Sequence, residues 1–235
     1  MQAIILAGGK GTRLRAAVPD VPKPIAPVGG RPFLEHQMAH WVAQGVDRFI
    51  VSVGYKAAMI MDRVGNRFGN VPVDYSVEDQ PRGTGGGLLL AIQRLRSHAP
   101  FLVLNGDTFF DLPLPDLHRV HHSKNSDWTL GLFLTNDPRR YLGAELDHDG
   151  RLISLAAPLE NREVWANGGV YMISPGVLSH VAERFSGEIS LEDEILPALL
   201  ARNSALYGIR HSGRFIDIGI PSDYQRAADV LRLRD

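Results

Sequence analysis

The sequence predicts an α/β fold in which a mixed, mainly parallel sheet is flanked by helices and followed by a smaller β-rich half. Three observations carry this prediction. In the first half, short apolar runs alternate with segments of helical periodicity, as in parallel sheets with helical crossovers. After Asp127 the apolar runs follow one another with turns between them. Glycines follow the first apolar run directly, where a strand of such a sheet would open into a ligand-binding loop.

The first half begins with Ala3–Leu6, which is expected to be a buried strand because it is short, apolar and followed closely by Gly8. Similar runs recur, separated by stretches long enough for helices. Crossovers of that length join parallel strands and place helices on both faces of the sheet. The expected strands are Ala3–Leu6, Phe49–Val53, Val71–Val77 and Phe101–Leu104, and the expected helices are Phe33–Gln44, Ala57–Phe68 and Thr84–Arg96.

The second half is expected to be mainly strands, with two helices after them. Asp149-Gly150 is typical of a hairpin turn between two of the strands. Pro221 occupies a favoured position in the first turn of the last helix. The expected strands are Trp128–Leu134, Ala144–Asp147, Leu152–Leu155 and Val164–Ile173, and the expected helices are Leu191–Arg202 and Pro221–Arg234.

Composition excludes several classes of partner. The formal net charge of -1 argues against nucleic acid and anionic membranes, since both require a basic surface. The chain has 0 cysteines, which excludes disulfides and thiolate zinc sites and is compatible with a reducing cytoplasm. The first apolar run is too short for a signal-peptide core or a membrane span. We expect a cytoplasmic enzyme that holds any anionic ligand locally.

The loop after the first strand is built to hold phosphate. Gly8, Gly9 and Gly11 let the backbone approach an anion closely, and Arg13 and Lys23 add positive charge. The spacing does not match a Walker loop, and Leu14 occupies the place of the third glycine of the dinucleotide fingerprint. An ordinary glycine turn would not need the two cations. The sequence therefore predicts a nucleoside triphosphate site.

The motifs resemble those of the sugar-phosphate nucleotidyltransferases, in order and spacing over nearly all of the chain. They are Leu6-Ala7-Gly8-Gly9-Lys10-Gly11-Thr12-Arg13-Leu14, Pro22-Lys23-Pro24, Gly83-Thr84-Gly85-Gly86-Gly87, Leu104-Asn105-Gly106-Asp107, Asn167-Gly168-Gly169-Val170-Tyr171 and Asp217-Ile218-Gly219. The resemblance implies a Rossmann-like sheet with a sugar-binding lid. It implies one domain over residues 1–235, with a nucleotide-binding half at 1–125 and a sugar-binding half at 126–235. Relatives of this kind commonly associate, so a homo-oligomer is possible.

The implied reaction is attack of a sugar 1-phosphate on the α-phosphorus of a nucleoside triphosphate. A phosphate monoester with a second pKa near ~6 is already mostly the dianion, so no general base is required. The chemistry instead needs cancellation of negative charge. Arg13 would grip the β- and γ-phosphates, Lys23 would neutralise the reacting phosphates, and Asp107 and Asp217 would hold Mg²⁺. Arg13, Lys23 and Asp107 are the predicted catalytic residues. Helix capping or an Asx turn is the alternative for each aspartate.

The base is predicted to be guanine. A carboxylate at Glu78 can accept hydrogen bonds from N1–H and N2–H₂ of guanine, whereas uracil and thymine offer one N–H between two carbonyls. Asp79 would serve equally, and Glu78 could alternatively be a surface charge at a strand end. The residues that the resemblance places at the nucleotide are Leu6, Ala7, Gly8, Gly9, Gly11, Thr12, Arg13, Lys23, Glu78, Gly83 and Thr84.

The sugar is assigned to Asn105, Gly143, Asn167 and Gly168. Amide side chains both donate to and accept from hydroxyls, and Gly143 allows close approach of the backbone. Here the chain departs from the family pattern. Ala157-Pro158 stands where the family has a Glu-Lys pair whose lysine meets the sugar phosphate. Arg139, Arg140 and Arg162 are candidates for the missing charge; alternatively, the metal carries more of it.

Two segments, Ser190-Leu191-Glu192-Asp193-Glu194 and Phe215–Pro221, are most similar to those of D-glycero-α-D-manno-heptose 1-phosphate guanylyltransferases. The expected partners are therefore GTP, or another nucleoside triphosphate, and a sugar 1-phosphate. An N-acetylmuramate 1-phosphate uridylyltransferase, a mannose 1-phosphate guanylyltransferase, a nucleotide-sugar-dependent glycosyltransferase and a non-catalytic sensor are the alternatives. His118, His121 and His122 are expected to form a solvated cluster without a metal.

Overall fold

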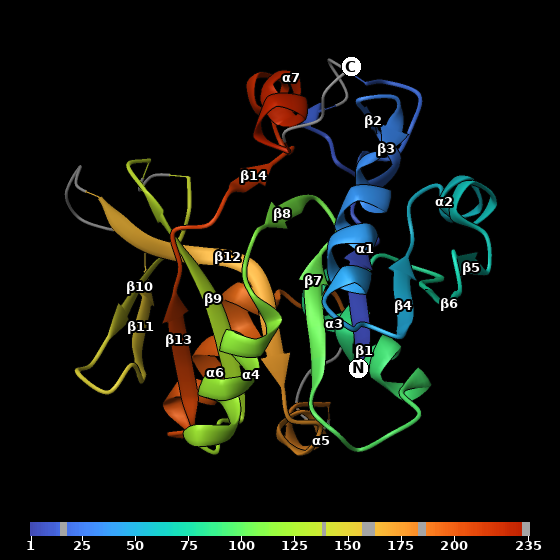
Figure 1. The fold of residues 1–235 in the computed structure, drawn as a ribbon. Helices are drawn as coiled ribbons and strands as arrows, with labels where there is room; N and C mark the ends of the chain where they lie inside the picture. Colours follow the sequence, from blue (N-terminus) through green and yellow to red (C-terminus); the bar gives the residue numbers. More distant parts are fainter. Residues whose placement is uncertain (15–17, 138–139, 157–162, 183–186, 232–235) are drawn as a thin grey trace.

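The centre of the protein is a parallel sheet with the strand order β7-β1-β4-β6, seen in a computed structural model that describes residues 1–14, 18–137, 140–156, 163–182 and 187–231. Figure 1 shows these strands beside one another, with helices packed around them. The expectation of a mainly parallel α/β sheet is confirmed in this half. The strands are β1 (Gln2–Ala7), β4 (Arg48–Val53), β6 (Val71–Val77) and β7 (Phe101–Asn105).

The central strands are apolar on both faces because helices cover both. In β1, Ala3, Ile5 and Ala7 belong to one buried cluster and Ile4 to another, which reflects the alternation of side chains along a strand. The first cluster includes side chains of α1, α2 and α4, and the second includes side chains of α3, α5 and α6. These helices span Phe33–Ala43, Ala57–Val64 and Leu114–Ser123 on the first face, and Gly83–Ala91, Gly176–Ala182 and Leu196–Ala201 on the second.

The β-rich half extends the same sheet. Strand β12 (Val164–Ile173) pairs antiparallel with β7 and with β9, and its register against β9 shifts between Asn167 and Tyr171. On the N-terminal side of this shift, β12 also pairs with β10. Strand β12 therefore connects the parallel sheet to the β-rich half. The remaining strands of this half are β9 (Trp128–Thr135), β10 (Gly143–Leu146), β11 (Leu152–Ala156) and β13 (Leu206–Arg210).

Three expected helices differ from those observed. The helix expected over Thr84–Arg96 is α3, which ends at Ala91, followed by a 3-10 turn, η3 (Ile92–Arg94). Helix α2 ends at Val64 because Gly65 has a φ of 71°, and β5 (Arg67–Phe68) then pairs with β6. The expected helix Leu191–Arg202 is divided into a π-helical turn, η4 (Leu191–Ile195), and α6. Pro197 follows the junction and has no N–H to donate, so regular helical bonding is interrupted there.

A third buried cluster ties the C-terminal helix α7 (Pro221–Val230) to the N-terminal segment. It contains Leu14 and Val28 from the first part of the chain, and Ile216 and Ala227 from the last. The short strands β8 (Thr108–Phe110) and β14 (Phe215–Asp217), which the sequence pattern did not indicate, pair antiparallel and contribute Phe109 and Ile216 to this cluster. Figure 1 shows α7 close to β2 (Pro27–Val28) and β3 (Arg31–Pro32). Helix α7 and the segment from Leu14 to Phe33 thus pack together at one end of the sheet.

The histidines of α4 differ from expectation. His121 is buried and bonds to Thr129 Oγ1 at 2.9 Å and to Ser174 Oγ at 3.0 Å, so it is not solvated. Burial lowers its pKa to about 4, and the neighbouring His122 and His118 add to this effect. Within the described residues, no three metal-binding side chains come together, and no helix has the length and apolar character needed to cross a membrane.

Candidate active site

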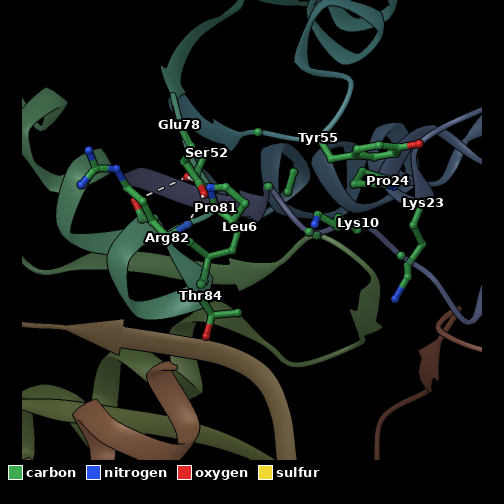
Figure 2. A pocket seen from close by; sticks show the side chains of 18 of the residues that line it. Leu6, Lys10, Lys23, Pro24, Ser52, Tyr55, Glu78, Pro81, Arg82 and Thr84 are labelled. Atoms are coloured by element: carbon green, nitrogen blue, oxygen red, sulfur yellow. Dashed lines mark hydrogen bonds between the residues drawn. The ribbon is translucent and has the colours of Figure 1, made fainter. Parts of the chain in front are cut away.

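A cavity of about 620 Å³ opens at the carboxyl ends of the central parallel strands. It is the place where ligands bind in open α/β sheets. The structure brings together there the glycine loop, the glycine-rich start of α3 and the turn after β7 (Figure 2). Of the predicted site residues, Leu6, Ala7, Gly8, Gly9, Gly11, Lys23, Glu78, Gly83, Thr84, Asn105 and Asp107 line this cavity.

The glycine loop is held in place at Gly11. Gly11 has a φ of 58° and accepts a hydrogen bond at 3.1 Å from the backbone N–H of Leu14, whose side chain is buried. A Cβ at Gly11 would lie 3.2 Å from Cβ of Lys23, so the loop rests directly on the lysine. Lys23 therefore extends beside the loop, as Figure 2 shows.

Thr12 and Arg13 are not brought into the cavity. Both are exposed, and neither is among the residues that line it. The phosphate-binding role of Arg13 stays a prediction.

Glu78 lies between the two glycine-rich segments. A Cβ at either Gly8 or Gly87 would collide with its Oε1, so both positions require glycine as long as the carboxylate stays there. Ser52 Oγ donates to Oε1 at 3.2 Å and the backbone N–H of Arg82 donates to Oε2 at 3.1 Å. Burial raises the pKa of Glu78, while those two hydrogen bonds oppose the rise. Glu78 is thus a half-buried, fixed carboxylate in the cavity wall (Figure 2) rather than a mobile surface charge.

The start of α3 is fixed by the segment before η4. Gly83 has a φ of 68°, and a Cβ there would collide with the carbonyl oxygen of Ile189. That carbonyl accepts from the backbone N–H of Gly85 at 2.8 Å. Thr84 Oγ1 accepts from the backbone N–H of Leu191 at 2.8 Å and donates to Glu192 at 3.1 Å. The glycines and Thr84 therefore join the two halves as well as lining the cavity.

The turn that carries Asp107 lies against the glycine loop. A Cβ at Gly106 would lie 2.7 Å from the carbonyl oxygen of Leu6, which accepts from the backbone N–H of Gly106 at 2.9 Å. Gln37 Nε2 donates to the carbonyls of Asn105 and Thr108, at 2.9 and 2.7 Å, and so links the two sides of the turn. Lys23 Nζ forms an ion pair with Asp107 Oδ2 at 2.7 Å.

Asp217 reaches Asp107 because β14 pairs with β8. Asp217 lies opposite Thr108 in this ladder, and the backbone N–H of Ile218 donates to the carbonyl of Asp107 at 3.0 Å. Burial raises the pKa of Asp217, and repulsion from Asp107 raises it further. Two carboxylates that repel each other in this way have the hard oxygen atoms that Mg²⁺ prefers. Since the described residues supply no third such group, phosphate oxygens and water would complete the coordination.

Of the predicted sugar residues, Asn105 lines the cavity, whereas Gly143, Asn167 and Gly168 lie on the neighbouring strands β10 and β12, outside the cavity lining. Asn167 Nδ2 donates to the Tyr171 hydroxyl at 2.7 Å, and its Oδ1 accepts from the backbone N–H of Gly169 at 3.1 Å. Gly143 pairs with Ala166 at the start of β10. Gly168 is buried, and a Cβ there would lie 2.7 Å from Cδ1 of Phe110, so packing alone accounts for this glycine.

Of the candidates for the missing sugar-phosphate charge, Arg140 is described, and its Nη2 donates to Asp217 Oδ2 at 3.0 Å. Arg139, Arg162 and Ala157-Pro158 fall outside the described residues.

Comparison with known proteins is decisive for the family. Residues 2–232 match the family model described as nucleotidyl transferase. The chain belongs to the nucleotidyl transferase family. A D-glycero-alpha-D-manno-heptose 1-phosphate guanylyltransferase of Aneurinibacillus thermoaerophilus is 36% identical over 232 residues, which cover 99% of this nucleotidyl transferase and 99% of the relative.

Two further relatives bear on specificity. The crystal structure of HddC from Yersinia pseudotuberculosis complexed with GMP-PN superposes on this nucleotidyl transferase with a TM-score of 0.82 and 33% identity, covering 97% of this chain and 98% of the other. A mannose-1-phosphate guanylyltransferase of Mycobacterium tuberculosis is 33% identical, and the match covers 99% of this chain but 65% of the relative.

Several residues of this nucleotidyl transferase that shape the cavity were missed by sequence reasoning. Ser52 and Glu188 line the cavity, and Gln37 supports the Asp107 turn, although none of them belongs to a glycine-rich or acidic motif. Ser52 and Gln37 share a signal, a polar residue at an otherwise apolar position of a strand or helix, whereas Glu188 is an exposed loop residue without one. Ser52 in β4 and Gln37 in α1 both fit that description, and both are buried.

Proposed function

We propose that the protein transfers GMP from GTP to D-glycero-α-D-manno-heptose 1-phosphate, giving the GDP-sugar and pyrophosphate. The observation that carries this proposal is the full-length similarity to enzymes named for that reaction, at 36% identity over 99% of both chains for one of them. The fixed carboxylate of Glu78 in the cavity wall supports guanine. Each of its oxygens accepts one hydrogen bond from the protein and retains capacity for a second, from N1–H and N2–H₂ of the base.

In this proposal the protein acts by holding charge, and none of its residues removes a proton. The backbone amides of Gly8, Gly9 and Gly11 and the ammonium of Lys23 face the triphosphate, and Arg13 closes on its outer phosphates. Asp107 and Asp217 hold Mg²⁺, which when bound neutralises charge on the reacting phosphates. Residues 1–125 then serve the nucleotide and residues 126–235 the sugar, through Gly143 and Asn167.

Mannose 1-phosphate is the second candidate for the sugar, because the Mycobacterium tuberculosis guanylyltransferase named for it is 33% identical over 99% of this chain. The two sugars share the manno ring and differ by one CHOH unit in the side chain, so the contacts that select between them lie at that end of the sugar. The cytoplasmic location and the homo-oligomer stay predictions.

A substrate matrix tests the proposal. Pyrophosphate release is measured with GTP, UTP, dTTP and CTP against heptose 1-phosphate, mannose 1-phosphate and N-acetylmuramate 1-phosphate. The expected result is the highest kcat/KM for GTP with heptose 1-phosphate. Exclusive turnover with UTP would contradict the guanine assignment. Release of pyrophosphate from none of the mixtures, together with transfer of sugar from an added GDP-sugar to an acceptor in a separate assay, would indicate a glycosyltransferase.

Substitution of Glu78 tests the assignment of the base. Glu78→Gln replaces one acceptor oxygen with a donor and is expected to lower kcat/KM for GTP about 10- to 100-fold, the usual effect of losing a hydrogen bond to a charged group. The matched control is Asp79→Asn, at an exposed neighbour that also lines the cavity. A larger loss in Asp79→Asn than in Glu78→Gln would transfer the role to Asp79.

A further inference from the structure

Each carboxylate assigned to the metal is already paired with a cation of the protein. Lys23 Nζ lies 2.7 Å from Asp107 Oδ2. Arg140 Nη2 lies 3.0 Å from Asp217 Oδ2 and donates to the backbone carbonyl of Asp217 at 3.1 Å. The two pairs are equivalent in chemistry, although only Lys23 has a function in the proposed reaction.

Arg140 is held in place from several sides. Its Nη1 forms an ion pair with Asp223, a buried residue in the first turn of α7, and its guanidinium carbon lies 4.9 Å from the centre of the Tyr141 ring. Asp223 is also held by Arg226, at 2.9 Å. The Arg140 side chain is 15% exposed, so its position is well defined but open to solvent on one side.

The Nε of Arg140 is buried and has no hydrogen-bond partner among the described residues. A buried donor without an acceptor is costly, and arginine donors are especially suited to phosphate, which they can grip with two parallel bonds. Arg140 also directly precedes the segment that enters β10 at Gly143, the residue assigned to the sugar. The unmet donor, the charge and the location all indicate an anionic group on the sugar side of the metal carboxylates.

We propose that Arg140 binds the phosphate of the sugar 1-phosphate and takes the role of the lysine missing at Ala157-Pro158. This inference rests on the proposed function. In the free protein Arg140 neutralises Asp217. When Asp217 ligates Mg²⁺, its negative charge is met by the ion, and Arg140 donates to the sugar phosphate while Asp223 keeps the guanidinium in place.

A purely structural role for Arg140 predicts a different outcome. If Arg140 only orients Asp217, its loss weakens metal binding and affects both substrates alike. If Arg140 neutralises Asp217 until the phosphate arrives, its loss leaves metal binding intact or tightens it, because a competing cation has been removed. Only the second role concentrates the kinetic defect on the sugar 1-phosphate.

The variants are Arg140→Gln and Arg140→Lys, with Arg226→Gln as matched control. Arg226 pairs with the same Asp223 but is 63% exposed on α7. The measurements are KM for GTP and for the sugar 1-phosphate, Mn²⁺ binding to the substrate-free protein by electron paramagnetic resonance, and the thermal unfolding midpoint.

Arg140→Gln is expected to raise KM for the sugar 1-phosphate about 10- to 100-fold, with KM for GTP changed less than about threefold and Mn²⁺ bound at least as tightly as in wild type. Arg140→Lys should have a KM for the sugar 1-phosphate between those of wild type and Arg140→Gln. Its ammonium restores the charge but cannot form the two parallel hydrogen bonds of a guanidinium. Arg226→Gln should match wild type in both KM values. Equal rises in the two KM values, or weaker Mn²⁺ binding with an unchanged KM for the sugar phosphate, would overturn the inference.

Failure of the proposed function gives a separate signal. If the wild-type protein releases no pyrophosphate with any pair of nucleotide and sugar 1-phosphate, the proposed reaction is wrong. Calorimetric binding of a sugar 1-phosphate in the presence of Mn²⁺ then still compares wild type with Arg140→Lys. Should Arg140→Gln fail to fold, Arg140→Lys carries the kinetic comparison, and a wild-type KM for the sugar phosphate in that variant would refute the role of the guanidinium fork.

Discussion

At the residue scale, the two predicted phosphate-binding cations differ in what they do without ligand. Lys23 is half-buried against the glycine loop and forms an ion pair with Asp107, whereas Arg13 is exposed. A residue that meets only the ligand can be removed without harm to the fold. A residue that also neutralises a part-buried carboxylate cannot, because its loss leaves that charge unpaired.

Alanine substitutions at these two positions should therefore separate binding from stability. Arg13→Ala is expected to lower kcat/KM for GTP at least about 100-fold with the unfolding midpoint unchanged, since two charge-assisted hydrogen bonds are lost. Lys23→Ala should lower both kcat/KM and the free energy of unfolding, the latter by about 1–2 kcal/mol. Steady-state kinetics and urea unfolding measure the two effects. Equal unfolding curves for the two variants would show that the Lys23–Asp107 pair does not stabilise the protein.

His121 gives the protein a pH-dependent stability. Its pKa is lowered from an ordinary value of 6.5 to about 4 in the folded protein, mainly by burial. The unfolded chain therefore binds more protons between these values, and stability present above pH 6.5 is lost as the pH falls toward 4.

His121→Gln should remove this dependence. Between pH 7 and pH 5 the wild-type free energy of unfolding is expected to fall by about 2 kcal/mol more than that of the variant. Urea unfolding at both pH values measures the difference. His148→Gln, at a side chain that is 90% exposed, is the control and should follow wild type. A parallel fall in wild type and His121→Gln would assign the acid sensitivity to other groups.

At the scale of elements, the start of α3 depends on contact between two segments far apart in sequence. Gly83 and the backbone of Ile189 approach so closely that a side chain at position 83 cannot be accommodated. Glu188, next to Ile189, lines the cavity. Displacement of this segment therefore alters both the packing of the second half and the wall of the nucleotide site.

Two glycine substitutions distinguish strain from collision. Gly65 and Gly83 have φ values of 71° and 68°, but a Cβ at Gly65 would meet nothing within 4 Å. Gly65→Ala should cost about 1 kcal/mol for the left-handed backbone alone, and Gly83→Ala about 2 kcal/mol or more. Gly83→Ala should also raise KM for GTP, whereas Gly65→Ala should not. Similar unfolding free energies for both variants would mean that the segment at Ile189 yields without cost.

Prediction from sequence was effective for elements whose signal is local. The apolar runs and the glycine loop identified the central strands and the cavity edge, because the ends of parallel strands meet there. The helix predicted through Phe68 failed because the pattern continued past Gly65, where the backbone turns. The π-helical turn was missed because a single proline inside an apolar stretch still has helical periodicity.

At the scale of the whole molecule, the two proposed metal ligands come from opposite halves of the chain. Asp107 follows β7, and Asp217 ends β14, which pairs with β8. No local pattern indicates this pairing, because both strands are short. The proximity of the two aspartates could be expected only from the family resemblance. Similarly, the close approach of Gly168 to Phe110 depends on packing between strands that the pattern did not align.

Metal binding across the halves should stabilise the folded protein. At ten times its dissociation constant, Mn²⁺ contributes about 1.4 kcal/mol, which corresponds to a rise of about 3–5 °C in the unfolding midpoint of a chain of this size. Asp217→Asn should abolish the rise. Asp229→Asn, at an exposed acidic residue of α7, should retain it. A rise of the same size in Asp217→Asn would place the ion elsewhere.

The pairing of β8 with β14 also bears on protein synthesis. A chain still emerging from the ribosome can form the glycine loop and β7 early. It has only Asp107 of the two proposed metal ligands until Asp217 has been translated. The nascent polypeptide is therefore expected to be inactive toward its substrates. Activity arises late, in a single event, when β14 pairs with β8.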